Sequence, residues 1–151
     1  QKHKIKIIQQ TNIDNVDNLR SIYNKNDIEN KIFNFEKDFT DLIHQSDLCI
    51  TRAGASTLSE LSVMNKPFLA VPLHSSKDNH QFENADFYYN LNCCWIINQI
   101  DFNTERLEIF LDKLLTDKTD YLNKKINLKK LNYHNSWNNV NQKLIETIDE
   151  N

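Results

Sequence analysis

The sequence predicts an α/β protein with a Rossmann-like parallel sheet that helices cover on both faces. Short, nearly continuous apolar runs are typical of strands buried on both faces of a parallel sheet. These runs alternate along the chain with segments of helical periodicity, as they do in βαβ units. A chain of 151 residues is long enough to bury a core of this kind in one domain.

Each expected element rests on its own pattern of apolar residues. The expected strands are residues 4–8, 31–35, 48–50, 68–71 and 93–97. The expected helices are residues 15–23, 39–45, 57–65, 81–90, 104–115 and 136–148. Most of these helices place apolar residues on one face; in chain order these are Val16, Leu19, Ile22 and Tyr23, then Leu42 and Ile43, then Leu58, Leu61 and Met64, then Leu107, Phe110, Leu111 and Leu114, and last Val140, Leu144 and Ile148.

The alternation of strands and helices stops before the end of the chain. Residues 1–118 are therefore interpreted as a partial Rossmann-like domain, and residues 119–151 as a C-terminal helical tail. The tail carries four lysines, which are expected on a solvated helix face. They are Lys124, Lys125, Lys129 and Lys130.

Composition excludes several classes of function. A net charge of −3 gives no general basic field for nucleic acid. No apolar run approaches the roughly 18 residues of a membrane span. The three cysteines, Cys49, Cys93 and Cys94, show no metal-ligand spacing, so we expect buried thiols and no metal site.

The only glycine, Gly54, stands between an apolar run and a predicted helix. Glycine tolerates positive φ and allows a ligand to approach the backbone closely. A helix that begins at such a turn points N–H groups and the positive end of its dipole at one place. Ligands of parallel α/β sheets bind at the carboxyl ends of the strands, where loops 36–38, 52–56 and 73–80 are expected to meet.

Two features near this edge have more than one interpretation. Thr57 and Glu60 have the spacing of a capping box, but Glu60 could instead accept hydrogen bonds from a ribose. The loop before the next helix gathers hydroxyl, amide and imidazole groups around His80, and it could equally be a solvated loop. The sequence holds no serine nucleophile elbow, Walker motif or GxGxxG pattern.

Residues 47–60, 67–73 and 78–85 together resemble the C-terminal domain of the MurG family, the family-28 glycosyltransferases of peptidoglycan synthesis. This resemblance implies the C-terminal half of a GT-B fold, lacking its first strand and loop. It also implies that the chain binds UDP-N-acetylglucosamine (UDP-GlcNAc). The implied donor-binding residues are Glu36, Gly54, Ala55, Ser56, Thr57, Leu58, Ser59, Glu60, His80 and Gln81.

The resemblance assigns a role to most of these residues. The backbone of Ala55, Ser56 and Thr57 would meet the diphosphate, and Glu60 would hold the ribose hydroxyls. The remaining assignments are the backbone of Glu36 to the uracil edge and Gln81, with His80 beside it, to the GlcNAc hydroxyls.

Members of the family transfer GlcNAc to lipid I and so form lipid II. The resemblance implies no cofactor and no catalytic residue in this chain, because the acceptor site and the catalytic base belong to an N-terminal domain. The fragment alone is therefore expected to be inactive. The full-length protein would meet lipid I at the cytoplasmic face of the bacterial inner membrane, as a peripheral protein.

Two other functions remain open at this point. The chain could be a stand-alone UDP-GlcNAc-binding subunit that is active only with a separate membrane-associated partner. It could also be a nucleotide-sugar hydrolase of similar fold, for which His80 is the one plausible catalytic residue.

Overall fold

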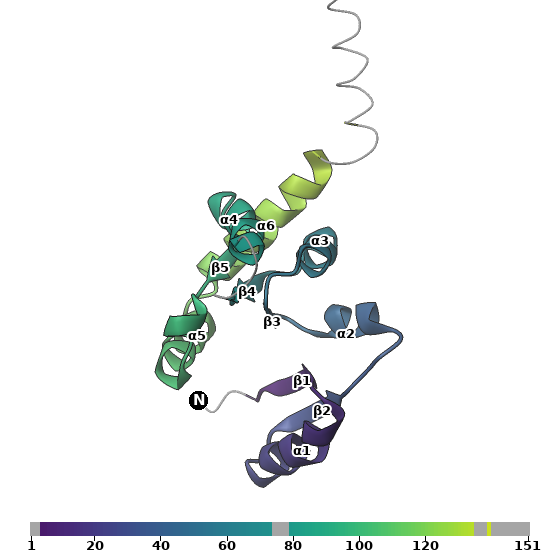
Figure 1. Ribbon diagram of the computed structural model, residues 1–151. Coiled ribbons are helices and arrows are strands. Elements are labelled where there is room, and N and C mark those ends of the chain that lie inside the picture. The colour runs from purple at the N-terminus through teal and green to yellow at the C-terminus, as the bar shows by residue number, and fades with distance from the viewer. Residues whose placement is uncertain (1–3, 74–78, 135–138, 140–151) are drawn as a thin grey trace, which may run out of the picture. The chain divides into compact units, whose positions relative to one another are not determined.

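The computed structural model describes residues 4–73, 79–134 and 139 (Figure 1). The strands are β1 (Lys6–Gln10), β2 (Glu29–Phe33), β3 (Cys49–Thr51), β4 (Phe68–Ala70) and β5 (Cys94–Ile96). The α-helices are α1 (Val16–Lys25), α2 (Phe39–Gln45), α3 (Ala55–Val63), α4 (His80–Asn90), α5 (Thr104–Thr116) and α6 (Thr119–His134). Two short 3-10 helices, η1 (Ile13–Asn15) and η3 (Gln99–Asp101), precede α1 and α5.

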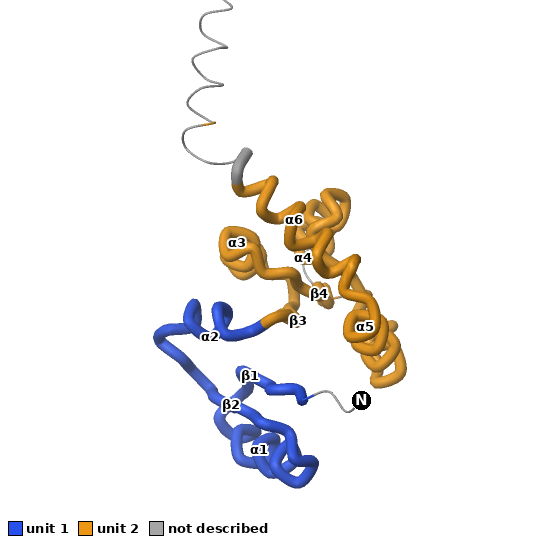
Figure 2. Tube along the Cα trace, turned by 180° about the vertical axis from the view of Figure 1, so that it is seen from behind, with its two compact units in different colours: residues 1–46 blue, residues 47–151 orange. Residues whose placement is uncertain are grey.

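Contacts divide the chain into two compact units, residues 1–46 and 47–151 (Figure 2). In the first unit, β1 and β2 pair in parallel, from Lys6 opposite Glu29 to Gln10 opposite Phe33. Helix α1 connects these strands, and the Tyr23 hydroxyl donates to Gln9 Oε1 at 2.6 Å. The first unit is therefore a βαβ crossover, as the sequence predicts.

In the second unit three parallel strands form a sheet in the order β3-β4-β5. The central strand, β4, is buried along its whole length. Helices α3 and α4 pack Leu58, Leu61 and Ala85 into the core, and the ring of Tyr88 on α4 meets Phe68 edge-on. Because the strands are parallel, β3 and β4 end at the same edge of the sheet.

The parallel strands and intervening helices confirm the predicted α/β fold class. The five strands form two separate sheets, β1-β2 and β3-β4-β5, where one sheet is expected. β1 begins two residues later than the expected range 4–8, and β2 begins two residues earlier than the expected range 31–35. The predicted helix 136–148 falls outside the described residues apart from residue 139. The domain boundary at residue 118 stays a prediction.

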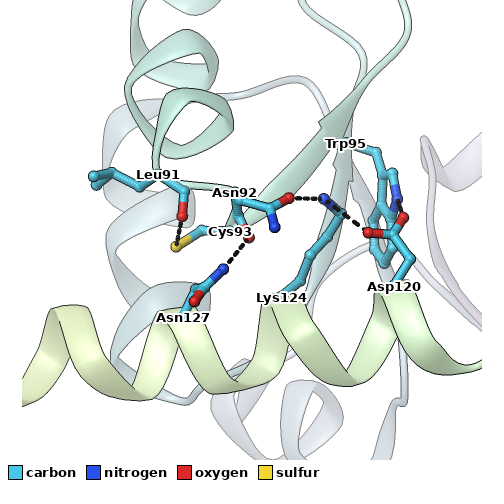
Figure 3. A network of polar contacts seen from close by, with 7 residues as sticks. All are labelled: Leu91, Asn92, Cys93, Trp95, Asp120, Lys124 and Asn127. Atoms are coloured by element: carbon cyan, nitrogen blue, oxygen red, sulfur yellow. Dashed lines mark hydrogen bonds and ion pairs between the residues drawn. The ribbon is translucent and has the colours of Figure 1, made fainter.

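One lysine of the predicted solvated face is buried instead, which corrects that expectation. Lys124 on α6 is 4% exposed, and its Nζ donates to Asn92 Oδ1 at 2.8 Å (Figure 3). The same ammonium group lies 3.5 Å from Asp120 Oδ1 and 4.8 Å from the centre of the Trp95 ring. A buried lysine is tolerated where such groups replace its water, and here they attach α6 to the α4–β5 turn.

Cys93 and Cys94, at the start of β5, confirm the expectation of buried thiols. Cys93 and Cys94 are fully buried, and the thiol of Cys94 points at the carbonyl oxygen of Ala85 at 3.6 Å. Burial raises the pKa of Cys94 to about 12 and also raises the pKa of Cys93, because an apolar environment disfavours the thiolate. Cys49 in β3 is partly buried.

Candidate functional site

The turn between β3 and α3 takes its shape from Ala53. This residue is fully buried and has a φ of 66°, in the left-handed region. Gly54 has a φ of −63° and a ψ of 136°, the extended geometry of a residue that precedes a helix. The expectation that Gly54 supplies the positive φ is therefore wrong, because the chain reverses one residue earlier.

Gly54 leaves open space beside the helix start. Apart from Gly54 itself and its two chain neighbours, no atom of the described residues would lie within 4 Å of a Cβ atom placed on Gly54. Neither the backbone conformation of Gly54 nor its packing against the described residues requires glycine. Close approach of another molecule is a physical reason for glycine that agrees with both facts.

The first turn of α3 presents backbone donors. Leu58 N–H is the first to bond back within the helix, to the carbonyl oxygen of Gly54 at 3.0 Å. The N–H groups of Ala55, Ser56 and Thr57 thus precede the helix's own hydrogen-bond ladder. No acidic residue stands in the first turn, so the positive end of the helix dipole is not offset there.

The capping box expected from Thr57 and Glu60 does not form. The N-cap of α3 is Gly54, so Thr57 is the third residue of the helix rather than its cap. Glu60 lies one turn beyond Ser56 on the same exposed face, since residues four apart share a helix face. Its carboxylate therefore does not cap α3.

Leu58 and Ser59 have different surroundings. Leu58 is fully buried and its N–H is already bonded to Gly54, so its described contacts are those of a core residue. Ser59 is exposed and lines a shallow hollow between α3 and α4, with Ala55, Glu83 and Asn84 also on its wall.

Helix α4 brings a second set of polar groups to the same edge. It begins at His80, which is exposed, after Asn79 in the left-handed conformation with a φ of 56°. Gln81 Oε1 accepts a hydrogen bond from the backbone N–H of Leu73 at 2.9 Å. This bond fixes the Gln81 amide beside Leu73, which follows β4 by three residues, and the NH2 group of Gln81 keeps its capacity to donate. Residues 74–78 of the predicted polar loop lie outside the described residues.

Asn84 was not assigned a role from the sequence, yet it connects the two segments. Its Nδ2 donates to the carbonyl oxygen of Ala53 at 3.3 Å. The sequence carries a signal for it, because Asn84 stands three positions after Gln81 and so falls on the same face of a helix. Through these contacts the structure brings the 54–60 segment and Gln81 to one edge of the β3-β4-β5 sheet.

Glu36 belongs to the first compact unit, whereas α3 and α4 belong to the second. It lies in the loop after β2, and its Oε2 is 2.6 Å from Lys31 Nζ. The hydrogen bond and the charge of Lys31 lower the pKa of the Glu36 carboxyl group, with smaller contributions from the N–H groups of Asp38 and Lys37. The side chain is thus engaged within its own loop, and its predicted role depends only on the backbone.

Two further features of the described residues bear on function. None of the described helices is both long enough and apolar enough to cross a membrane. The described side chains also include no group of three or more His, Cys, Asp or Glu residues arranged to hold a metal ion.

A parallel α/β unit with backbone donors at a strand–helix turn has the architecture of the open-sheet domains, a class whose ligand sites lie beyond the carboxyl ends of the strands. Comparison with known protein families identifies the family within this class. The family described as Glycosyltransferase family 28 C-terminal domain matches residues 1–140. The chain belongs to this family.

Curated relatives support the assignment along almost the whole chain. A "UDP-N-acetylglucosamine--N-acetylmuramyl-(pentapeptide) pyrophosphoryl-undecaprenol N-acetylglucosamine transferase" from Pelagibacter ubique is 47% identical over 99% of this chain. The protein of the same name from Rickettsia bellii is 32% identical over 84% of the chain. The chain spans 42% and 36% of the lengths of these two relatives.

Solved structures show the same fold. The Acinetobacter baumannii MurG crystal structure aligns with a TM-score of 0.72 and 23% identity, over 83% of this chain and 37% of that one. A glycotransferase of kitacinnamycin aligns with a TM-score of 0.61 and 13% identity, over 96% of this chain and 43% of that one. These alignments confirm that the chain has the fold of a part of such glycosyltransferases, as predicted for half of a GT-B fold.

Proposed function

We propose that this chain is the donor-binding half of a transferase that moves GlcNAc from UDP-GlcNAc to lipid I and so forms lipid II. One observation carries the proposal: the chain is 47% identical, over 99% of its length, to a relative named for that transfer. The N–H donors at the start of α3 provide a chemical reason, since a nucleotide-sugar diphosphate is an anion suited to a helix N-terminus.

Each polar group of the edge has a part in this proposal. The N–H groups of Ala55, Ser56 and Thr57 bind the diphosphate, and the open space beside Gly54 lets it approach. Glu60, which does not cap α3, accepts hydrogen bonds from the ribose diol.

The sugar and the base are bound by the remaining residues. Gln81, held through its oxygen by Leu73, donates its NH2 group to GlcNAc hydroxyls, with His80 beside it. Glu36 offers backbone groups to the uracil edge.

The transfer itself requires a second half. Glycosyl transfer needs donor and acceptor held in one geometry, and the chain spans 42% of the Pelagibacter relative. In this proposal the catalytic base and the lipid I site lie in the part of the full-length protein beyond this chain. That protein works without a cofactor, as a peripheral protein at the cytoplasmic face of the bacterial inner membrane.

Calorimetric titration of the chain with UDP-GlcNAc tests the proposal, with UDP and UDP-glucose as comparison ligands. We expect UDP-GlcNAc to bind more tightly than UDP-glucose, without release of free sugar. A folded chain that binds none of the three ligands would contradict the proposal. Steady release of GlcNAc would favour a hydrolase instead.

A further inference from the structure

The outer edge of strand β5 has no partner strand among the described residues. β5 is the last strand of the sheet in the order β3-β4-β5. Its inner edge pairs with β4, and Ile97 N–H donates to the carbonyl oxygen of Ala70 at 3.0 Å. The backbone groups of successive strand residues point to opposite sides, so the N–H and C=O groups of Ile96 point away from β4. This edge therefore offers a donor and an acceptor to a further strand.

A cavity of about 300 Å³ lies beside this edge, between the end of β5 and helix α5. One side of it is formed by three consecutive residues of the β5 segment, Ile96, Ile97 and Asn98. The other side is formed by α5 and the turn before it, through Asp101, Arg106, Ile109, Phe110 and Lys113. The volume is at the lower limit of ligand pockets, and it suits side chains that an added strand would insert beside the edge.

The α5 side of the cavity is one face of the helix. Arg106, Ile109, Phe110 and Lys113 lie three or four positions apart and so share a face. Phe110 meets the ring of Trp95 edge-on, with ring centres 5.3 Å apart, which attaches this face to β5. Ile109 is 58% exposed and stands between two exposed cations. The face therefore combines an uncovered apolar residue with positive charge.

The charges of α5 are sorted between its faces. Its acidic residues, Glu105, Glu108 and Asp112, follow a different stripe of the helix from the cavity face. Arg106 stands in the first turn, where a cation opposes the helix dipole, so helix stability does not account for it. The cavity face carries two cations and Asp101 as its one carboxylate, although the whole chain has a net charge of −3.

We propose that the outer edge of β5 binds an extended acidic peptide of another protein, which adds to the sheet as a further strand. Strand addition supplies main-chain hydrogen bonds, here to Ile96, and pockets beside the edge select alternate side chains. An apolar side chain of the peptide enters the cavity against Ile109 and Phe110. Carboxylates of the peptide pair with Arg106 and Lys113, and the guanidinium fork of Arg106 suits a carboxylate.

Charge favours an acidic peptide over a second copy of this chain. Two copies that paired through the same edge would form an interface in which the same surface faces itself. Arg106 and Lys113 of one copy would then face the same cations of the other, and like charges across an interface are unfavourable. The inference goes beyond the proposed donor site, because Ala55, Thr57, Glu60 and Gln81 do not line this cavity.

Fluorescence anisotropy with synthetic peptides of about ten residues tests the edge on the full 151-residue chain. The probe alternates Glu and Val. One comparison peptide alternates Lys and Val, and another is the Glu–Val peptide with N-methyl groups on its backbone amides. The variant of the protein combines Arg106→Gln with Lys113→Gln. The matched control combines Lys125→Gln with Lys129→Gln, two exposed lysines of α6, so that both proteins have the same net charge.

We expect the Glu–Val peptide to bind at least about tenfold more tightly than either comparison peptide, because they lack the charges or the backbone donors that strand addition uses. The Arg106→Gln/Lys113→Gln protein should bind it at least about threefold more weakly, since two exposed ion pairs are lost. The control protein should bind like the unmodified chain. Amide hydrogen exchange at Ile96 should be rapid in the free chain and slow in the complex.

Failure of the Glu–Val peptide to bind, equal binding of the Lys–Val peptide, or an equal loss in the control protein would overturn the proposal. Slow exchange at Ile96 in the dilute free chain would mean that the chain itself already pairs with this edge. Slow exchange that appears only at high protein concentration would assign the edge to a second copy, and either result would also overturn it.

Competition separates this edge from the donor site. Saturating UDP-GlcNAc should leave the affinity for the Glu–Val peptide unchanged. Displacement of the peptide by UDP-GlcNAc would mean that the peptide occupies the donor site as an anion, and it would overturn the proposal. Calorimetry with UDP-GlcNAc alone tests the donor site separately.

Discussion

The side-chain amide of Asn84 donates a hydrogen bond to the carbonyl oxygen of Ala53 at 3.3 Å, and Ala53 is the left-handed residue of the β3–α3 turn. Helix α4 therefore holds the turn that starts α3. The contact thus joins α4, which carries Gln81, to the turn that precedes the backbone donors of α3.

Substitutions at the two adjacent residues of this turn should differ strongly in their effect on stability. We expect Ala53→Val to lower the free energy of unfolding by at least about 2 kcal/mol, because a branched side chain resists positive φ and overfills a buried site. Gly54→Ala should change stability by less than about 1 kcal/mol, since its φ is ordinary and a Cβ has room. Urea denaturation measures both, and a strongly destabilised Gly54→Ala protein would refute the assignment of the turn to Ala53.

The Gly54→Ala protein also tests the donor site. Its added methyl group occupies the open space beside the first N–H donors of α3, so affinity for UDP-GlcNAc should fall although the protein stays folded. Calorimetry on this variant would show whether that space is used by ligand. Undiminished affinity would mean that the donor does not approach Gly54.

Glu60→Ala should weaken UDP-GlcNAc binding by about 1–3 kcal/mol, the range for hydrogen bonds to a charged group. Because Glu60 does not cap α3, its removal should leave the melting temperature nearly unchanged. Glu105→Ala, an exposed carboxylate at the start of α5, is the matched control for charge. Equal affinities of the two variants would remove Glu60 from the donor site.

The sequence predicts the parallel α/β fold and the strand–helix turn because both depend on local apolar patterns and on a single glycine. It does not predict which residue of the turn is left-handed, because Ala53 is held there by a contact from α4, 31 positions along the chain. The same reason applies to Lys124, whose burial depends on Asn92 and Trp95. Local charge patterns cannot distinguish such a lysine from its exposed neighbour Lys125.

That pair of neighbouring lysines provides a matched test of the packing of α6. Lys124→Ala should lower the free energy of unfolding by about 2–4 kcal/mol, since it removes a packed stem and leaves Asn92 Oδ1 without its donor. Lys125→Ala should change it by less than about 0.5 kcal/mol, as surface substitutions do. Equal effects of the two substitutions in denaturant unfolding would contradict the burial of Lys124.

The buried cysteines should react slowly with thiol reagents at pH 8 in the folded protein. Burial raises the pKa of Cys94 to about 12, so its thiolate is scarce and inaccessible, and urea should release both Cys93 and Cys94 for reaction. Because the raised pKa means that the folded state keeps a proton that the unfolded state loses, stability should fall as the pH rises from about 9 to about 12. Rapid labelling of Cys93 or Cys94 under native conditions would contradict their burial.

The ion pair of Glu36 should make stability depend on acid pH. Lys31 lowers the pKa of Glu36 below its usual 4.5, so the pair stabilises the folded state above that value. The contribution is lost as the pH falls from 4.5 through the lowered pKa. Lys31→Gln should return the Glu36 titration, followed by NMR, toward its ordinary range, and an unchanged titration would show that Lys31 is not the cause.

The central claim is that the start of α3 and Gln81 bind the donor together. An NMR titration of the labelled chain with UDP-GlcNAc tests this most directly, because it reports each backbone amide. We predict saturable shifts concentrated at Ala55, Ser56, Thr57, Glu60 and Gln81, with the amides of α5 unchanged. Saturable shifts that leave the first turn of α3 untouched, or no shifts at all in the folded chain, would contradict the account.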